Sequence, residues 1–292
     1  MPDPRRYATA GAFRRSLEDR LNQLSRNQGL DIGRLRRRIA FERLLARLFI
    51  VPNPRWMLKG GYAIELRLQN LARATKDIDL SISGGSEGRA INRSLRGWLQ
   101  EELGNDLSDW FVFFLGEQTS DLTAAPLGGT RFHVEAQVDH RPFARFNLDV
   151  GIGDVVPSDP EWITGHELLS FAGIPPARIA VLPLDHQFAE KIHAYSLPRE
   201  RVNTRVRDLV DLVLLIDHGL PPPEQINRAL RATFDRRTTH AVPVVLPFPP
   251  QSWQEPYAAL AAEHTVRVTT VDAAYKYISI YWSKLGLSVE QP

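Results

Sequence analysis

Cysteine is absent from the 292-residue sequence, and methionine occurs only twice. Without cysteine the chain has no disulfide framework, zinc–thiolate site, iron–sulfur cluster or thiol nucleophile. Long apolar runs are also missing, and none approaches the roughly 18 residues that a membrane-spanning helix requires. The opening residues, MPDPRRYATAGAFRR, contain no apolar stretch of the signal-peptide type. We therefore expect a cytoplasmic protein with no membrane partner.

Lysine is also scarce, since only five residues are lysine: Lys59, Lys76, Lys191, Lys276 and Lys284. Arginine is the usual cation of this chain, so a lysine can mark a place that needs a compact point charge. Apolar residues make up 43% of the sequence and charged residues 24%, which excludes wholesale disorder. The length predicts one large domain or two modest ones.

The charge is unevenly distributed along the chain. Residues 1–50 contain twelve arginines and no lysine against five acids, a local balance of +7. The whole chain carries +2, so the rest of it carries −5. A basic N-terminal arm on a mildly acidic body indicates a polyanionic partner or an acidic protein partner. The alternative is that the arm is a pair of amphipathic helices packed on the body.

Periodicity predicts a helical arm over 11–27 and 31–50, with Asp31 as the N-cap of its second helix. An α/β body follows, with a short strand at 56–58, helices over 62–68 and 89–102, and strands at 77–82, 110–115, 131–138 and 143–150. The Gly128-Gly129 and His140–Pro142 turns separate the last strands, and Pro157–Pro160 and Pro175–Pro183 are expected connectors. The remainder predicts helices over 186–196, 205–218, 223–235, 254–263 and 271–285.

These elements predict an α/β (α+β) fold in which helices flank a mixed sheet. We expect a domain over 1–155, with the basic helices and the sheet, and a mainly helical domain over 156–292.

Two carboxylates stand out in the segment Asp77-Ile78-Asp79-Leu80-Ser81-Ile82. Its strict alternation places Asp77 and Asp79 on one face of a strand, about 6–7 Å apart. Such a pair suits hard divalent cations, which prefer oxygen ligands, and two such cations can clamp a phosphoryl displacement. Sixteen residues before Asp77, the Gly60-Gly61 turn at a helix start is a natural cradle for phosphate oxygens.

Two cations generally require a third carboxylate. Asp149 is the first candidate, because Leu148 and Val150 beside it point to the opposite face of an expected strand. Asp154 is the second candidate, and the sequence does not decide between them.

The segments LKGGYAIELR and RATKDIDLSI resemble the signature of the AbiEii/MenT toxin family, within the nucleotidyltransferase superfamily that includes DNA polymerase β. The resemblance implies a nucleotidyltransferase fold and transfer of a nucleoside monophosphate from an NTP to an acceptor, with release of pyrophosphate. It also implies that Asp77 and Asp79 are catalytic ligands of Mg²⁺ or Mn²⁺, and that Gly60-Gly61 contacts the triphosphate.

Two later segments are similar to further motifs of that family. AEKIHA carries Lys191, which the resemblance assigns to the nucleotide, where its charge would neutralise the triphosphate. RDLVDL carries Arg207, Asp208 and Asp211, which helical spacing places on one face. Asp208 or Asp211 would orient Lys191, or contact the nucleotide or the acceptor.

Residues beside these motifs are further candidates. Lys59 joins the nucleotide-binding set, and Arg73 and Lys76 are either triphosphate contacts or exposed loop charges. Thr75 lies beside the carboxylates, so a phosphate on it would misplace the metals and inactivate the enzyme.

The resemblance further implies the toxin of a toxin–antitoxin pair, with an antitoxin partner and with RNA as acceptor, most specifically the 3′ end of tRNA. The arginine-rich arm fits RNA independently, because arginines bind phosphates in a sequence-tolerant way. We expect Arg34, Arg36, Arg37 and Arg38 to contact the RNA. The alternatives are a small-molecule nucleotidyltransferase of the aminoglycoside type, a kinase-like phosphotransferase and a non-catalytic RNA- or antitoxin-binding module.

Overall fold

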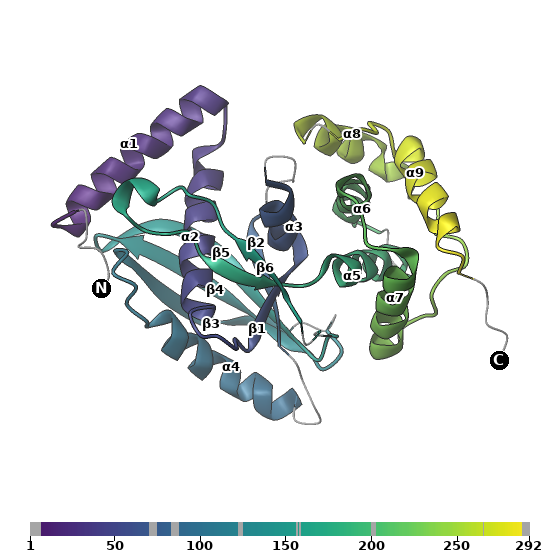
Figure 1. Ribbon diagram of the computed structural model, residues 1–292, viewed down its shortest axis with the longest axis horizontal. Coiled ribbons are helices and arrows are strands. Elements are labelled where there is room, and N and C mark those ends of the chain that lie inside the picture. The colour runs from purple at the N-terminus through teal and green to yellow at the C-terminus, as the bar shows by residue number, and fades with distance from the viewer. Residues whose placement is uncertain are drawn as a thin grey trace. The chain divides into compact units, whose positions relative to one another are not determined.

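The computed structural model describes residues 7–69, 75–82, 88–121, 125–155, 157, 159–199, 203–264 and 266–287 (Figure 1). These residues form a mixed α/β fold, with a seven-stranded mixed sheet and nine α-helices. The predicted fold class is therefore confirmed. None of the described helices combines the length and the apolar character that crossing a membrane requires.

The chain divides into two compact units that are not contiguous in sequence. Unit 1 comprises residues 1–58, 74–156 and 160–181, and unit 2 comprises residues 59–73, 157–159 and 182–292. The division at residue 155 into two folding domains stays a prediction, because compactness alone does not show which segments fold independently.

The sheet has the strand order β3-β4-β5-β2-β1-β7-β6. β3 (Phe111–Asp121), β4 (Gly129–Val138) and β5 (Arg141–Ile152) form an antiparallel meander. β2 (Asp77–Ile82) pairs with β5 in parallel, and β1 (Trp56–Lys59) pairs with β7 (Arg178–Val181) in parallel. β6 (Glu161–Thr164) closes the far edge against β7.

One face of the central strands is apolar and buried. Ile78 and Leu80 of β2 and Leu148 and Val150 of β5 are fully buried. α2 (Ile32–Leu48) packs on β5, where the rings of Phe41 and Phe146 meet edge to face at 4.8 Å. α4 (Gly88–Leu103) packs on β3, on β5 and on α2. The alternating pattern of β2 thus turns its carboxylates to the opposite face.

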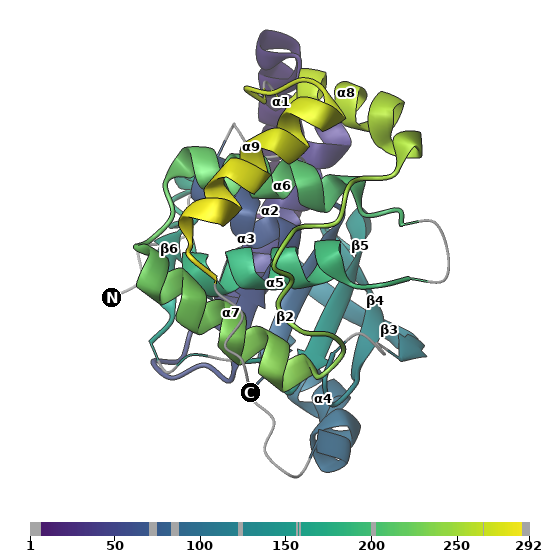
Figure 2. The ribbon, with the colours of Figure 1, turned by 90° about the vertical axis from the view of Figure 1, so that its right-hand side faces the viewer.

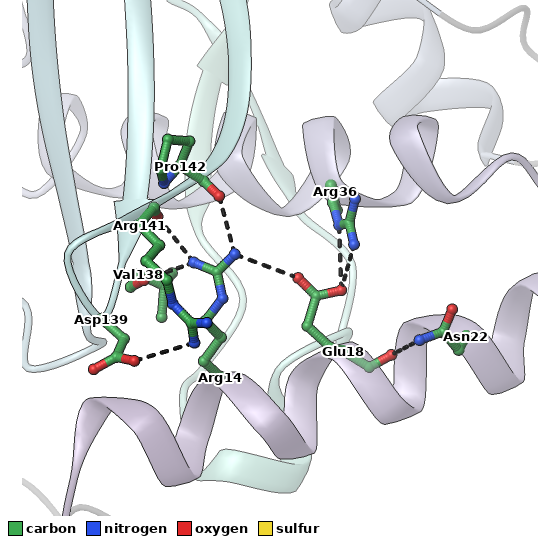
Figure 3. A network of polar contacts seen from close by, with 8 residues as sticks. All are labelled: Arg14, Glu18, Asn22, Arg36, Val138, Asp139, Arg141 and Pro142. Atoms are coloured by element: carbon green, nitrogen blue, oxygen red, sulfur yellow. Dashed lines mark hydrogen bonds and ion pairs between the residues drawn. The ribbon is translucent and has the colours of Figure 1, made fainter.

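α1 (Ala10–Gln28) is anchored to the meander by a polar network (Figure 3). The Arg14 guanidinium donates to the carbonyls of Val138, Arg141 and Pro142 at 2.7, 2.9 and 3.0 Å. Glu18, one turn along α1, accepts from Arg36 of α2 at 2.6 Å. The expected N-cap of α2 is confirmed, since Asp31 accepts from the Arg34 backbone N–H at 2.7 Å. The two N-terminal helices are therefore part of unit 1 rather than a loose arm.

Unit 2 is built from helices α3 (Gly60–Leu68), α5 (Leu184–Ser196), α6 (Val206–His218), α7 (Pro223–Arg237), α8 (Gln254–Glu263) and α9 (Val271–Lys284). α5 packs against α6 and α7, while α6 packs against α8 and α9 (Figure 2). Phe188, Leu212, Leu230, Tyr257 and Ile278 contribute to one apolar cluster across these helices. The predicted helices are all present, with ends that differ by a few residues.

Two details of the expected layout are wrong. β7 lies inside the stretch Pro175–Pro183 that was expected to be a connector, because its four residues are stabilised by β1 and β6 rather than by a pattern of their own. The turn expected over His140–Pro142 lies one residue earlier. Asp139 and His140 adopt positive φ, and β5 begins at Arg141.

Candidate active site

Asp77 and Asp79 lie on the polar face of β2, as the alternation predicts. Parallel pairing with β5 places Asn147 beside Asp77, Asp149 beside Asp79 and Gly151 beside Ser81. Both aspartates are half-buried, whereas Ile78 and Leu80 between and after them are fully buried. The sheet register therefore gathers three carboxylates on one face of unit 1, from strands about seventy residues apart in sequence.

Asp77 and Asp149 each have a defined side-chain neighbour. Asn147 donates from Nδ2 to Asp77 Oδ1 at 2.8 Å, and His133 donates from Nδ1 to Asn147 Oδ1 at 2.7 Å. Arg131 of β4 forms a two-pronged ion pair with Asp149, with Nε–Oδ1 at 2.7 Å and Nη2–Oδ2 at 2.6 Å. The hydrogen bonds that Arg131 donates to Asp149, and the charges of Asp149, Asp77 and Asp79, raise the pKa of Arg131 above its ordinary value. Arg131 is therefore a permanent cation on this face.

The carboxylate face fits a divalent cation through Asp77 and Asp79. Mg²⁺ is commonly held by one or two carboxylates, with substrate phosphates and water completing its octahedron. Among the described residues, no group of three or more histidine, cysteine, aspartate or glutamate side chains is arranged to hold a metal ion. Asp149 stands where a third ligand was predicted, but Arg131 occupies both of its oxygens. As a third ligand Asp149 stays a prediction, and Arg131 balances part of the charge that it would offer a cation.

Asp154 and Thr75 have structural partners near the same strand. Asp154 is buried and accepts from the Ser81 hydroxyl at 2.9 Å, one position beyond Asp79 on the polar face. Thr75 is nearly buried and its hydroxyl donates to the Asp77 carbonyl at 3.3 Å. Phosphorylation of Thr75 stays a prediction, and a kinase would first have to expose this hydroxyl.

In unit 2, Gly60 and Gly61 begin helix α3. Gly60 has φ of +66°, a conformation that glycine adopts without strain. The Gly60 carbonyl accepts from Gln187 Nε2 of α5 at 2.9 Å, and Gln187 in turn accepts from Arg67. Lys59, which precedes the turn, pairs with Glu190 at 3.2 Å, and Arg237 reaches the same carboxylate at 3.4 Å. The helix start is thus fixed against α5 and has two cations beside it.

Lys191 also lies in unit 2, between two buried carboxylates. Its Nζ is 2.7 Å from Asp208 Oδ1 and 2.7 Å from Asp211 Oδ2, both on α6. Both aspartates are therefore ion-paired with Lys191, and a contact of either with the nucleotide or the acceptor stays a prediction. Arg205 approaches the other oxygen of Asp208 at 3.6 Å. Arg207 is exposed at the start of α6, whereas Asp208 and Asp211 are buried, and its contact with the nucleotide stays a prediction.

The flanking cations differ in position. Lys76 is exposed directly before Asp77, and Arg73 lies outside the described residues. Of the four arginines expected to meet RNA, Arg34 and Arg37 are partly exposed, and Arg36 is paired with Glu18. Arg38 is buried, with 7% of the residue exposed, and its predicted RNA contact stays a prediction.

Comparison with family models matches residues 43–276, which is more than half of the chain, to the family described as "Nucleotidyl transferase AbiEii toxin, Type IV TA system". The chain belongs to this AbiEii family. It is therefore a nucleotidyltransferase of a toxin–antitoxin family, as the sequence motifs predicted. Membership also implies an antitoxin partner.

The solved structure of a toxin supports the fold of this AbiEii protein. MenT4, the nucleotidyltransferase toxin Rv2826c of Mycobacterium tuberculosis H37Rv, superposes with a TM-score of 0.62 at 16% identity, covering 92% of this chain and 91% of that one. The antibiotic-resistance factor ANT(2'')-Ia gives a TM-score of 0.37 at 17% identity, covering 69% and 93% of the two chains. A nucleotidyltransferase-like protein of Paracoccidioides brasiliensis gives 0.38 at 15% identity, covering 80% and 94%. Comparison with curated protein sequences found no match.

The motifs of this AbiEii protein did not reveal every residue around the candidate site. Asn147, Arg131 and Glu190 were missed, as was Arg205 beside Asp208. Asn147 sits two residues before Asp149, so the strand alternation that selected Asp149 also places Asn147 on the polar face. Arg131 carried no such signal, because its position depends on the pairing of β4 with β5.

Proposed function

We propose that this AbiEii protein transfers a nucleoside monophosphate from an NTP to the 3′ end of an RNA, most specifically of tRNA, and so blocks translation until its antitoxin intervenes. The observation that carries the chemistry is the Asp77–Asp79 pair, presented on one face of β2 beside Asn147 and Asp149. Asp77 and Asp79 would hold Mg²⁺ or Mn²⁺, which supplies positive charge where phosphate charge builds up. The RNA substrate agrees with the expected cytoplasmic location.

The reaction is a displacement at the α-phosphorus of the NTP. A hydroxyl oxygen of the acceptor loses its proton to water and forms the new bond, the bond between the α-phosphorus and the bridging oxygen breaks, and pyrophosphate leaves. In this proposal Lys191, oriented by Asp208 and Asp211, neutralises triphosphate charge, and the backbone N–H groups of Gly60-Gly61 bind phosphate oxygens. Lys59 and Lys76 belong to the same proposed nucleotide set.

The test is incubation of the purified protein with total tRNA, Mg²⁺ and each NTP labelled on the α-phosphate in turn. We expect label on the tRNA 3′ end with at least one NTP. A parallel reaction uses NTPs labelled on the γ-phosphate, and label that enters only from these would identify a phosphotransferase. No label with any of the four NTPs in either reaction would reject transfer to tRNA.

Asp77→Asn is the matched inactive variant. It keeps the size of the side chain and its acceptor oxygen for Asn147, while it removes the charge that a cation needs. We expect transfer to be abolished with an unchanged circular dichroism spectrum and melting temperature. Wild-type turnover by this variant would refute the metal-holding role of Asp77.

A further inference from the structure

A groove of about 950 Å³ lies on the polar face of unit 1 and has Asp77 in its wall. It is lined from the meander by Phe114, His133, Arg145 and Asn147, and from outside the meander by Arg37 and Lys76. All of these residues belong to unit 1. The groove is too large for a metal ion and its shell alone, so it has room for further substrate beside the carboxylates.

The sheet register orders the wall of this groove into two rows. In the row that includes Asp77, Asn147 is its neighbour on β5 and His133 follows on β4. In the next row, Arg145 of β5 lies beside Glu135 of β4, which lies beside Phe114 of β3. An occupant that starts at Asp77 and runs toward the β3 edge therefore meets an imidazole first and then an aromatic ring.

Phe114 is an exposed aromatic ring in an otherwise polar row. Its exposed fraction is 51%, although burying a phenylalanine stabilises a fold. Unstacked RNA bases bind by stacking on phenylalanine and histidine side chains. Exposure of Phe114 beside His133 therefore gives the groove two surfaces for bases.

Three cations line the groove: Arg37, Lys76 and Arg145. Glu135 is an anion in the same wall, but its two oxygens accept from Gln137 at 2.6 Å and from Arg145 at 2.5 Å. Those same hydrogen bonds lower the pKa of Glu135, so it stays an acceptor for its neighbours. A groove that has both cations and aromatic rings can bind the phosphates and the bases of a single strand.

We propose that this groove binds the last nucleotides of a single-stranded RNA acceptor, with the terminal hydroxyl at Asp77 and with a preceding base stacked on Phe114. This inference rests on the proposed function, which supplies the RNA acceptor. The inference adds the surface that binds this RNA. Two other occupants compete with this proposal. One is an antitoxin segment that pairs with the edge of β3, and the other is the base of the NTP.

The first experiment measures binding without catalysis. A fluorescent single-stranded RNA of six nucleotides is titrated with two proteins. One carries Asp77→Asn alone, and the other carries Asp77→Asn together with Phe114→Ala. We expect the Phe114→Ala change to weaken binding about 5- to 150-fold, the range for loss of one stacked base. Val112→Ala is the matched control, because Val112 is 53% exposed on the same strand and face but does not line the groove. Equal affinities of the Phe114 and Val112 variants would overturn the proposal.

The second experiment locates the RNA directly. The same oligonucleotide with 4-thiouridine near its 3′ end is irradiated with the protein, and the attached peptide is identified by mass spectrometry. We expect attachment within β3 or β4, at the peptides that carry Phe114 and His133. Attachment confined to other peptides would overturn the proposal.

A third measurement separates this inference from the proposed function. Transfer from labelled NTP to tRNA is measured for wild type and for Phe114→Ala. For Phe114→Ala, a higher KM for tRNA with an unchanged KM for NTP supports the groove as the acceptor site. A higher KM for NTP with an unchanged KM for tRNA assigns the groove to the nucleotide and overturns the proposal. If wild type labels tRNA but Phe114→Ala labels it equally well, the groove assignment fails alone. If wild type labels no RNA, the proposed function fails together with the groove assignment.

Discussion

At the scale of single residues, Arg131 decides how many carboxylates are available on the polar face. Alternation within β2 and β5 predicts Asp77, Asp79 and Asp149 on that face, and the structure places all three there. The alternation does not reveal that a guanidinium from β4 takes both oxygens of Asp149. The pairing register of the strands brings together residues that no local sequence pattern connects. The ion pair between Arg131 and Asp149 could therefore not be predicted from the sequence.

Manganese binding tests the role of Arg131. We expect Asp77→Asn and Asp79→Asn to weaken Mn²⁺ binding by more than about tenfold, as a lost ligand does. Asp149→Asn should weaken Mn²⁺ binding less, because Arg131 already balances the charge of Asp149. Arg131→Met should strengthen Mn²⁺ binding, since it leaves three carboxylates without their fixed cation. Isothermal titration calorimetry measures each affinity.

Arg145→Met is the control for that series, because Arg145 lies on the same face but pairs with Glu135 instead. We expect it to leave Mn²⁺ affinity unchanged. A drop for Asp149→Asn as large as that for Asp77→Asn would show that Asp149 is a ligand and that its pair with Arg131 opens on metal binding.

At the scale of elements, α2 shows why an arginine-rich helix need not be a nucleic-acid surface. Arg43 and Arg47 are buried and bind Asp109, a residue with no exposed surface, at 2.7 Å each. Arg47 further donates to the carbonyls of Arg43 and Phe111. The sequence predicted the helix and its cap correctly. It did not predict which arginines face inward, because their partner lies more than sixty residues away.

Asp109→Asn should destabilise unit 1 strongly. The change leaves two buried guanidinium groups without their counter-charge, which costs roughly 3–5 kcal/mol of unfolding free energy. Arg36→Ala is the control on the same helix. Its pair with Glu18 is partly exposed, so its loss should cost less than about 1 kcal/mol. Urea unfolding measures both values, and equal losses would contradict a special role for Asp109.

Acid should remove the same stabilisation. Burial acts to raise the pKa of Asp109, but hydrogen bonds and charge from Arg47 and Arg43 outweigh it and lower the pKa below the ordinary 3.8. A carboxyl with a lowered native pKa stabilises the fold above its unfolded pKa, and this contribution is lost as the pH falls through the native value. The stability difference between wild type and Asp109→Asn should therefore shrink below about pH 4. Urea unfolding at a series of pH values checks this, and a constant difference would contradict it.

At the scale of the whole molecule, the net charge of +2 conceals a basic N-terminal region and an acidic remainder. Part of that basic charge is used internally, by Arg14, Arg36, Arg43 and Arg47. The positive charge available to a polyanion is therefore smaller than the composition indicates. Within the N-terminal helices, Arg15, Arg20 and Arg26 of α1 are exposed. Arg34 and Arg37 of α2 are partly exposed, and Arg37 lies 3.9 Å from Asp31.

Salt dependence measures that available charge. We expect RNA affinity to fall with rising salt, because each neutralised phosphate releases counterions. Arg34→Ala combined with Arg37→Ala should reduce the slope of log affinity against log salt by about 1 to 2. Arg36→Ala should leave the slope unchanged, since Glu18 already neutralises Arg36. An unchanged slope in the double variant would remove α2 from the RNA surface.

The chain enters unit 2 at Lys59, returns to unit 1 at Ala74, and leaves it again for good after Val181. A gene fragment that ends near residue 155 would therefore encode α3 without the helices that bury Ile64 and Leu68, and β1 without its partner β7. No single cut yields either unit intact. Recombination that shuffles whole modules would break this enzyme, so its two halves are expected to have been inherited together.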